Sequence, residues 1–154
     1  MIEVNEQVYA PAAPQTVWDL LSHPEAVVEC VPGASLGEHH EDGSFDAGIV
    51  VKFGPAKVSF SANVLVAYDE PNQSGSVTAR GKDGISGTKF TTAMQFKVEG
   101  QDAPPQSAIP IKAECEISGR LAHLIESGAS MVIKRMTASF AEKLAEKCGG
   151  TKSA

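Results

Sequence analysis

Apolar and polar residues alternate along the first two thirds of the chain, and the spacing becomes helical near the end. Residues 2–10 alternate and predict a first strand, which Pro11 ends. Residues 15–21 predict a short helix with Pro14 in its first turn. A second short helix is predicted over residues 25–30. Two short helices thus follow the first strand directly.

From Gly33 the spacing returns to period two and keeps it for about 85 residues. Turn-forming residues interrupt it at intervals: Glu41-Asp42-Gly43, Gly54-Pro55, Asp69-Glu70-Pro71-Asn72, Asp83-Gly84 and residues 100–105. The connections are too short for crossover helices, so five or six further strands should form an antiparallel meander.

The two faces of these strands differ sharply in polarity. One face carries Lys, Ser, Thr and Glu. The other is almost purely apolar and comprises Phe45, Ala47, Ile49, Val51, Phe53, Val58, Phe60, Ala62, Val64, Val66, Phe90, Thr92, Met94, Phe96, Val98, Ile109, Ile111, Ala113, Cys115 and Ile117. A sheet with one apolar face must bury that face against another element.

The end of the chain supplies that element. From Gly119 to Cys148 no breaker interrupts a helical stripe of apolar residues: Leu121, Ile125, Val132, Met136, Phe140 and Leu144. A helix of about 28 residues would be roughly 40 Å long, enough to cross the sheet. The element order predicts an α+β helix-grip fold, a curved antiparallel sheet of six to seven strands around a long C-terminal helix. We expect one domain over residues 1–148 and a disordered tail over 149–154.

Composition narrows the classes of function. The 154-residue chain has a net charge of −6 and a pI near 5.2, which argues against nucleic acid as a partner. Its three cysteines are widely spaced and form no C-x-x-C pair, which excludes a disulfide framework and fits a reducing cytoplasm. Neither a signal peptide nor a run of about 18 apolar residues is visible.

Several short motifs, in order, resemble one known family. They are residues 13–21, His23-Pro24-Glu25, Cys30-Val31-Pro32-Gly33, residues 51–57, Gly81-Lys82-Asp83 and Ser118-Gly119-Arg120-Leu121-Ala122. As a set they resemble the CoxG-like family of carbon monoxide dehydrogenase subunits, within the START/Bet v 1-like (SRPBCC) superfamily. The resemblance extends over about 140 residues.

The resemblance implies an accessory protein for a molybdenum hydroxylase of the carbon monoxide or xanthine dehydrogenase type. Such a protein would hold a quinone in the helix-grip cavity, or would recruit the dehydrogenase to the membrane. We therefore expect a cytoplasmic protein that can lie peripherally at the inner face of the membrane. Some members carry a C-terminal membrane anchor, which we do not expect here. No cofactor is required, and a quinone or lipid is the expected bound molecule.

The central alternative is a ligand cavity or a solid core. Large apolar residues including Phe60, Met131 and Met136 would fill a core, whereas the small residues Ala47 and Ala62 favour a cavity. The expected ligand-binding residues are Trp18, Phe53, Phe60, Val64, Phe90, Thr92, Met94, Phe96, Ile111, Leu121, Ile125, Gly128, Val132 and Met136. The leading hypothesis is non-catalytic binding of an apolar small molecule.

Two alternative functions remain. The chain could dock on a dehydrogenase through its surface without any ligand, or could be a cyclase- or hydrolase-type enzyme of the same fold. Catalysis has little support, because the inward positions nearly lack acids and bases and Thr92 is their main polar residue. Adjacent His39 and His40 point to opposite faces of a strand, so we expect no metal site. Lys134 and Arg135 could make transient membrane contact.

Overall fold

The computed structural model describes residues 1–53 and 55–148, so the expected tail over 149–154 lies outside the described residues. Its sheet has eight antiparallel strands in the order β1-β8-β6-β5-β4-β3-β2, with β7 paired to β8. The strands are β1 (Ile2–Ala10), β2 (Ala34–His39), β3 (Phe45–Phe53), β4 (Ala56–Asp69), β5 (Ser74–Lys82), β6 (Lys89–Lys97), β7 (Glu99–Asp102) and β8 (Pro105–Ser118). The predicted fold class is confirmed.

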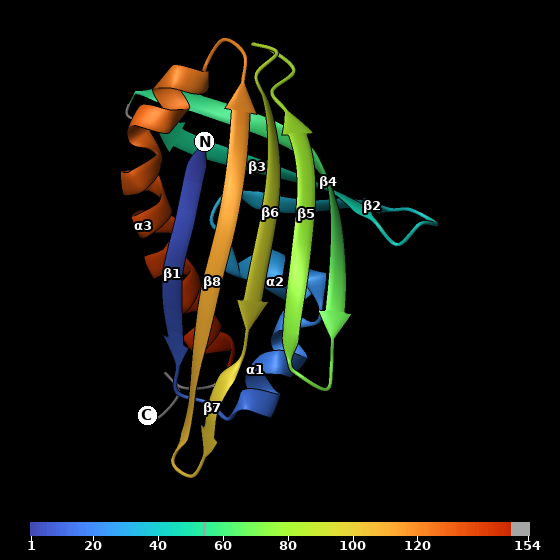
Figure 1. The fold of residues 1–154 in the computed structure, drawn as a ribbon, viewed down its shortest axis with the longest axis vertical. Helices are drawn as coiled ribbons and strands as arrows, with labels where there is room; N and C mark the ends of the chain where they lie inside the picture. The colour runs from blue at the N-terminus through green and yellow to red at the C-terminus, as the bar shows by residue number, and fades with distance from the viewer. Residues whose placement is uncertain (54, 149–154) are drawn as a thin grey trace.

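The strand count is one above the expected range. The sequence predicts a turn over residues 100–105, but residues 99–102 form the short strand β7 against the beginning of β8. The chain continues from β6 through Val98 into β7 in the same direction and then reverses at the β7–β8 turn. This reversal brings the turn-forming residues of β7 alongside β8, where they pair. Figure 1 shows β7 as the lower extension of the sheet.

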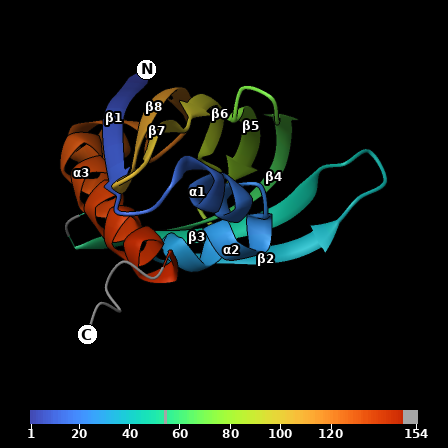
Figure 2. The ribbon, with the colours of Figure 1, turned by 90° about the horizontal axis from the view of Figure 1, so that it is seen from below.

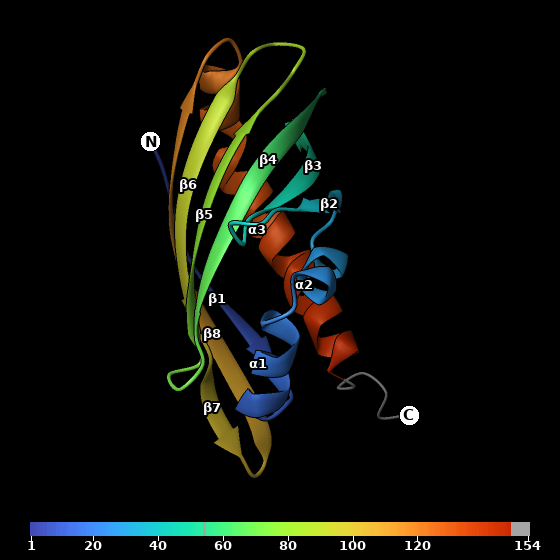
Figure 3. The same ribbon diagram turned by 90° about the vertical axis from the view of Figure 1, so that its right-hand side faces the viewer.

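Three helices complete the fold. They are α1 (Pro14–Leu21), α2 (Pro24–Cys30) and α3 (Ala122–Lys147). Proline occupies the first turn of α1 and of α2, where a missing N–H costs no hydrogen bond. In Figures 2 and 3 the sheet curves around α3, which crosses its concave side, and α1 and α2 close the lower end. None of the helices in the described part is long and apolar enough to span a membrane.

The apolar interior divides into two clusters at opposite ends of the sheet. The lower cluster joins α1 and the end of α3 to the sheet, with Trp18, Ile109 and Leu144 at most 2% exposed. The upper cluster joins the first half of α3 to β3 and β4 through Phe53, Val58, Phe60, Ile125 and Val132. The division leaves a central region of the inner face in neither cluster.

Candidate functional site

The central region consists of two rows of residues paired across four strands. One row is Val64, Ala79, Thr92 and Cys115, and the next is Val66, Val77, Met94 and Ala113. We call these eight residues the central strip. Only Ala113 is fully buried, and the other seven are partly exposed although they point to the inner face. Apolar side chains in a closely packed core would be buried, so solvent reaches this part of the inner face.

An aromatic ring lies over a glycine at each end of the central strip. Gly81 pairs with Phe90, and a Cβ on Gly81 would lie only 2.3 Å from Cε1 of that ring. Gly75 pairs with Phe96 in the same way, with a Cβ 2.6 Å from the ring's Cζ. Since both glycines lack a side chain, the two rings lie flat on β5. They limit the central strip along the strands.

Further aromatic contacts anchor these two rings. Phe90 meets Phe60 edge-on with their centroids 5.1 Å apart. Phe96 lies 6.3 Å from Trp18, which also meets Tyr68 edge-on at 6.1 Å. The edge-to-face pairs Phe60–Phe90 and Trp18–Tyr68 add to the free energy of packing beyond the area that they bury, whereas the rings of Phe96 and Trp18 are tilted at 34° to each other. An aromatic ring in contact with a further aromatic ring therefore lies at each end of the central strip.

The polar side chains of the central strip are Thr92 and Cys115, which face each other across β6 and β8. Burial raises the pKa of the Cys115 thiol, and a hydrogen bond from Thr92 lowers it in part. The thiol is therefore neutral near pH 7. The Thr92 hydroxyl has one proton, so it can donate to an oxygen atom of a bound molecule only by turning away from Cys115.

The structure distributes the fourteen predicted ligand-binding residues over three places. The upper cluster takes Phe53, Phe60, Phe90, Leu121, Ile125, Val132 and Met136, and Gly128 lies against Phe53. The lower cluster takes Trp18, Phe96 and Ile111. The central strip takes Val64, Thr92 and Met94. No observation here tests ligand contact, so the assignment stays a prediction, but most of these residues pack in the two clusters.

Sequence reasoning missed the other side chains of the central strip and one inner carboxylate. Ala79 and Val77 belong to the inner face of β5, which the alternation of residues 74–82 could have indicated. Glu6 lies on the inner face of β1 between Val4 and Val8, so the statement that inward positions nearly lack acids overlooked it. Met131, considered for the core, is 72% exposed on α3.

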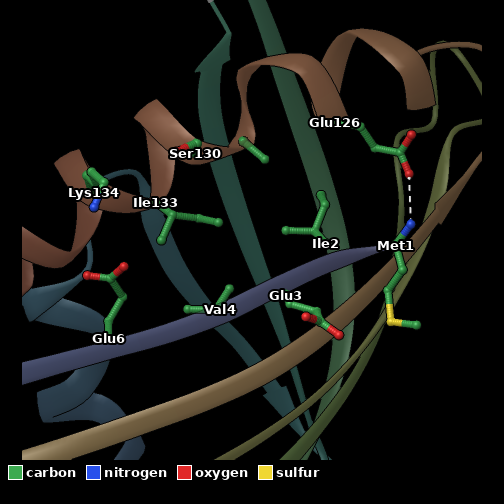
Figure 4. Close-up of a pocket in the computed structure, with 10 residues that line it drawn as sticks. Met1, Ile2, Glu3, Val4, Glu6, Glu126, Ser130, Ile133 and Lys134 are labelled. Atoms are coloured by element: carbon green, nitrogen blue, oxygen red, sulfur yellow. Dashed lines mark hydrogen bonds and ion pairs between the residues drawn. The ribbon is translucent and has the colours of Figure 1, made fainter.

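A hollow of about 270 Å³ opens in the seam between β1 and α3. Figure 4 shows Ile2, Val4 and Ile133 on its apolar walls and Glu6 facing Lys134 at one end. The N-terminal ammonium of Met1 pairs with Glu126 at 3.2 Å at the other end. None of the fourteen predicted residues lines this hollow. The hollow is slightly smaller than most ligand pockets, which measure about 300–1,000 Å³.

A second hollow, of about 500 Å³, lies mainly on the outer face of the sheet. It is lined mainly by outward side chains of β4, β5, β6 and β8, among them Ser76, Gln95 and Lys112. Of the fourteen predicted ligand-binding residues, Phe96 lines it. Small side chains on β4 and β5, Ala67 and Ser76, leave this depression between longer neighbours. This hollow is open to solvent and lies on the opposite side of the sheet from the inward side chains of the central strip.

The two adjacent histidines separate as expected, and one of them forms an ion pair. His40 Nε2 lies 2.9 Å from Asp46 Oδ1 in the hairpin between β2 and β3, which projects from the body in Figure 2. Within residues 1–53 and 55–148 no group of three metal-ligating side chains occurs. The hydrogen bond to Asp46 raises the pKa of His40, and the same bond lowers the pKa of Asp46.

We expect D46N to return the His40 pKa toward its ordinary value, about 6.5. The stability that protonated His40 gains from this contact is fully present below that pH and is lost as pH rises through the raised pKa. The stability that ionised Asp46 gains is fully present above about pH 3.9 and is lost as pH falls through the lowered pKa. The contact is therefore complete from about pH 4 to 6.5. NMR titration of the imidazole measures the shift, with E38Q as the control of smaller effect; an unchanged His40 pKa in D46N would contradict the assignment.

Comparison with known proteins agrees with the fold. A conserved protein from Geobacillus kaustophilus is 16% identical, with 97% of each chain covered and a TM-score of 0.83. A START superfamily protein from Mycobacterium smegmatis is 14% identical over 94% of this chain and 97% of its own, with a TM-score of 0.60. The Zhui aromatase/cyclase from Streptomyces sp. R1128 is 12% identical over 99% and 96%, with a TM-score of 0.62.

These structures share the fold with this chain. Because the sequence identities are low, the likeness shows the fold alone. No curated protein sequence matches the chain. The model of one protein family matches residues 6–149, which run from the middle of β1 through α3. That match agrees with the family resemblance in the sequence motifs. The chain belongs to the CoxG family of carbon monoxide dehydrogenase subunits.

Proposed function

We propose that the chain is a non-catalytic carrier that holds an apolar small molecule, a quinone or a lipid, against the central strip between the sheet and α3. It serves as an accessory to a carbon monoxide dehydrogenase-like molybdenum hydroxylase, in the cytoplasm that its cysteine usage favours. The observation that carries the proposal is the pair of inner-face rows that stay partly exposed between two packed clusters.

The chemistry of the central strip suits such a ligand. Valine, alanine and methionine side chains provide apolar walls, and methionine adapts to irregular shapes. Burying about 200 Å² of ligand surface would contribute on the order of 5 kcal/mol before association costs. The single hydroxyl proton of Thr92 would turn from Cys115 to a carbonyl oxygen of the ligand, which would orient a quinone ring between Phe90 and Phe96.

The test is native purification followed by mass spectrometry of the organic extract. We expect a stoichiometric quinone or lipid from the natural sequence and at least a tenfold smaller amount from A79L, because the added side chain fills the central strip. The matched control is A93L, which adds the same volume to the exposed outer face of the neighbouring strand β6. Equal occupancy in A79L and A93L would exclude the central strip as the site.

A second candidate function is docking on the dehydrogenase through the surface, with no ligand. The small volume of the seam hollow, about 270 Å³, favours it. The same two variants separate the candidates. A pull-down of the dehydrogenase that A79L leaves intact, together with an empty extract from the natural sequence, would support surface docking and contradict the carrier.

A further inference from the structure

The two rows of the central strip continue beyond β8 onto the edge strand β1. Cys115 pairs with Ile2, and Ala113 pairs with Val4. Ile2 and Val4 are therefore the β1 members of the same two rows, and both are partly exposed. The extended track from β4 to β1 crosses four strand spacings of about 4.8 Å, so it is roughly 19 Å wide.

The seam hollow between β1 and α3 begins where these rows reach β1. Ile2 and Val4 line its sheet side, and Ala129, Ser130 and Ile133 line its helix side (Figure 4). Ala129 and Ser130 have short side chains, so α3 leaves space opposite the two β1 residues. Val4 belongs to neither apolar cluster. The seam hollow and the extended rows of the central strip thus share two wall residues.

Contacts close the other sides of the central strip. The sheet is paired continuously from β1 to β2, so a ligand cannot pass between its strands. On the side of α1, Trp18 meets Tyr68 edge-on at 6.1 Å, and Gln73 Nε2 donates to Gln15 Oε1 at 3.1 Å. The upper cluster packs α3 against β3 through Phe53. Of these sides, the seam between β1 and α3 is the one with a hollow.

Charged side chains bound one end of the seam hollow. Glu6 is the next inward residue of β1 after Val4, and it faces Lys134 of α3 (Figure 4). Lys134 is exposed and Glu6 is partly exposed. Opposite charges at the surface stabilise a protein little, because water competes for both groups. These two side chains can therefore move apart without any loss of core packing.

We propose that the seam between β1 and α3 is the passage through which the ligand enters and leaves the central strip, and that the ligand is a slender apolar molecule. This inference rests on the proposed carrier function. The volume of about 270 Å³ lies below the 300–1,000 Å³ of most ligand pockets, so the seam hollow admits one part of a ligand at a time. A flexible chain or a flat ring can pass lengthwise, whereas a bulky rigid molecule cannot. The walls formed by Ile2, Val4 and Ile133 keep the moving molecule in apolar contact.

Stopped-flow binding of N-phenyl-1-naphthylamine tests the passage, because this neutral apolar dye emits more strongly once it leaves water. S130F adds a ring to the helix side of the seam hollow. It should slow association and dissociation equally, by about tenfold, and leave the dissociation constant unchanged, because a passage affects the path and not the bound state. I133A opens the apolar wall and should speed both rates about threefold. The matched control S127F adds the same ring at an exposed position of α3 outside the lining and should change neither rate.

The outcomes separate the passage from the carrier function. If the natural sequence does not bind the dye at equilibrium, the carrier function fails and the passage fails with it. If A79L weakens equilibrium binding while S130F and I133A leave both rates unchanged, the central strip stands and the passage is overturned. If S130F weakens equilibrium binding at an unchanged association rate, the seam hollow is part of the binding site, which also contradicts a passage. Equal urea midpoints of S130F and S127F verify that the added ring leaves the fold intact.

Discussion

L144A should lower the free energy of unfolding of the ligand-free protein by about 2–5 kcal/mol, whereas M94A should lower it by less than about 1 kcal/mol. Leu144 is 0% exposed in the lower cluster, so its truncation leaves a cavity lined by packed neighbours. Met94 belongs to the central strip and is partly exposed, so its truncation removes few contacts. The difference arises from packing, since both substitutions remove a side chain of similar size.

Urea unfolding of the two purified variants measures these changes through the midpoint, at constant slope. For a chain of this length the loss in L144A corresponds to a fall in Tm of roughly 6–15 °C. The comparison also decides between cavity and core. Similar losses in L144A and M94A would mean that the central strip is packed as densely as the lower cluster, and the carrier proposal would lose its structural basis.

The alternation of residues was enough to predict the fold and the two faces of the sheet, because period two is set by strand geometry. It assigned Phe60, Val64 and Phe90 to the inner face, which the structure confirms. The long helix was equally predictable, and α3 ends within one residue of the expected position. These features depend on local sequence only.

Register across strands could not be predicted in the same way. Alternation does not reveal that Phe90 pairs with Gly81 or that Phe96 pairs with Gly75, because strand length and turn geometry set the register. Those pairings place the two aromatic rings and leave the central strip between them. The inward position of Glu6 was available from alternation, but the apolar pattern around it concealed the exception. The candidate site therefore depends on long-range pairing more than on residue type.

The hydroxyl of Thr88 links the segments that contain two of the motifs that carry the family resemblance. Thr88, which is 0% exposed, follows the Gly81-Lys82-Asp83 motif and accepts a hydrogen bond from Leu121 N–H at 2.9 Å. Its Oγ1 also lies 2.8 Å from Ser86 Oγ. Gly119 has a φ of +112°, and a Cβ there would lie 2.9 Å from Thr88 Cα. The β5–β6 turn thus holds the segment that starts α3.

T88V should therefore lower the free energy of unfolding by about 1–3 kcal/mol, although valine has nearly the same shape as threonine. The substitution leaves the N–H of Leu121 without its acceptor at a site where Thr88 is fully buried, and the Ser86 hydroxyl loses one contact but keeps its hydrogen bond to Asp83 Oδ2. The matched control is T91V, on the exposed outer face of β6, the strand that begins directly after Thr88, which should change stability by less than about 0.5 kcal/mol. Hydrogen exchange should locate the loss, since amides in the first turns of α3 should exchange faster in T88V and remain unchanged in T91V. Equal stability of the two variants would show that the start of α3 is held by packing alone. In that case the contact between the two motifs would be incidental to the position of the helix over the sheet.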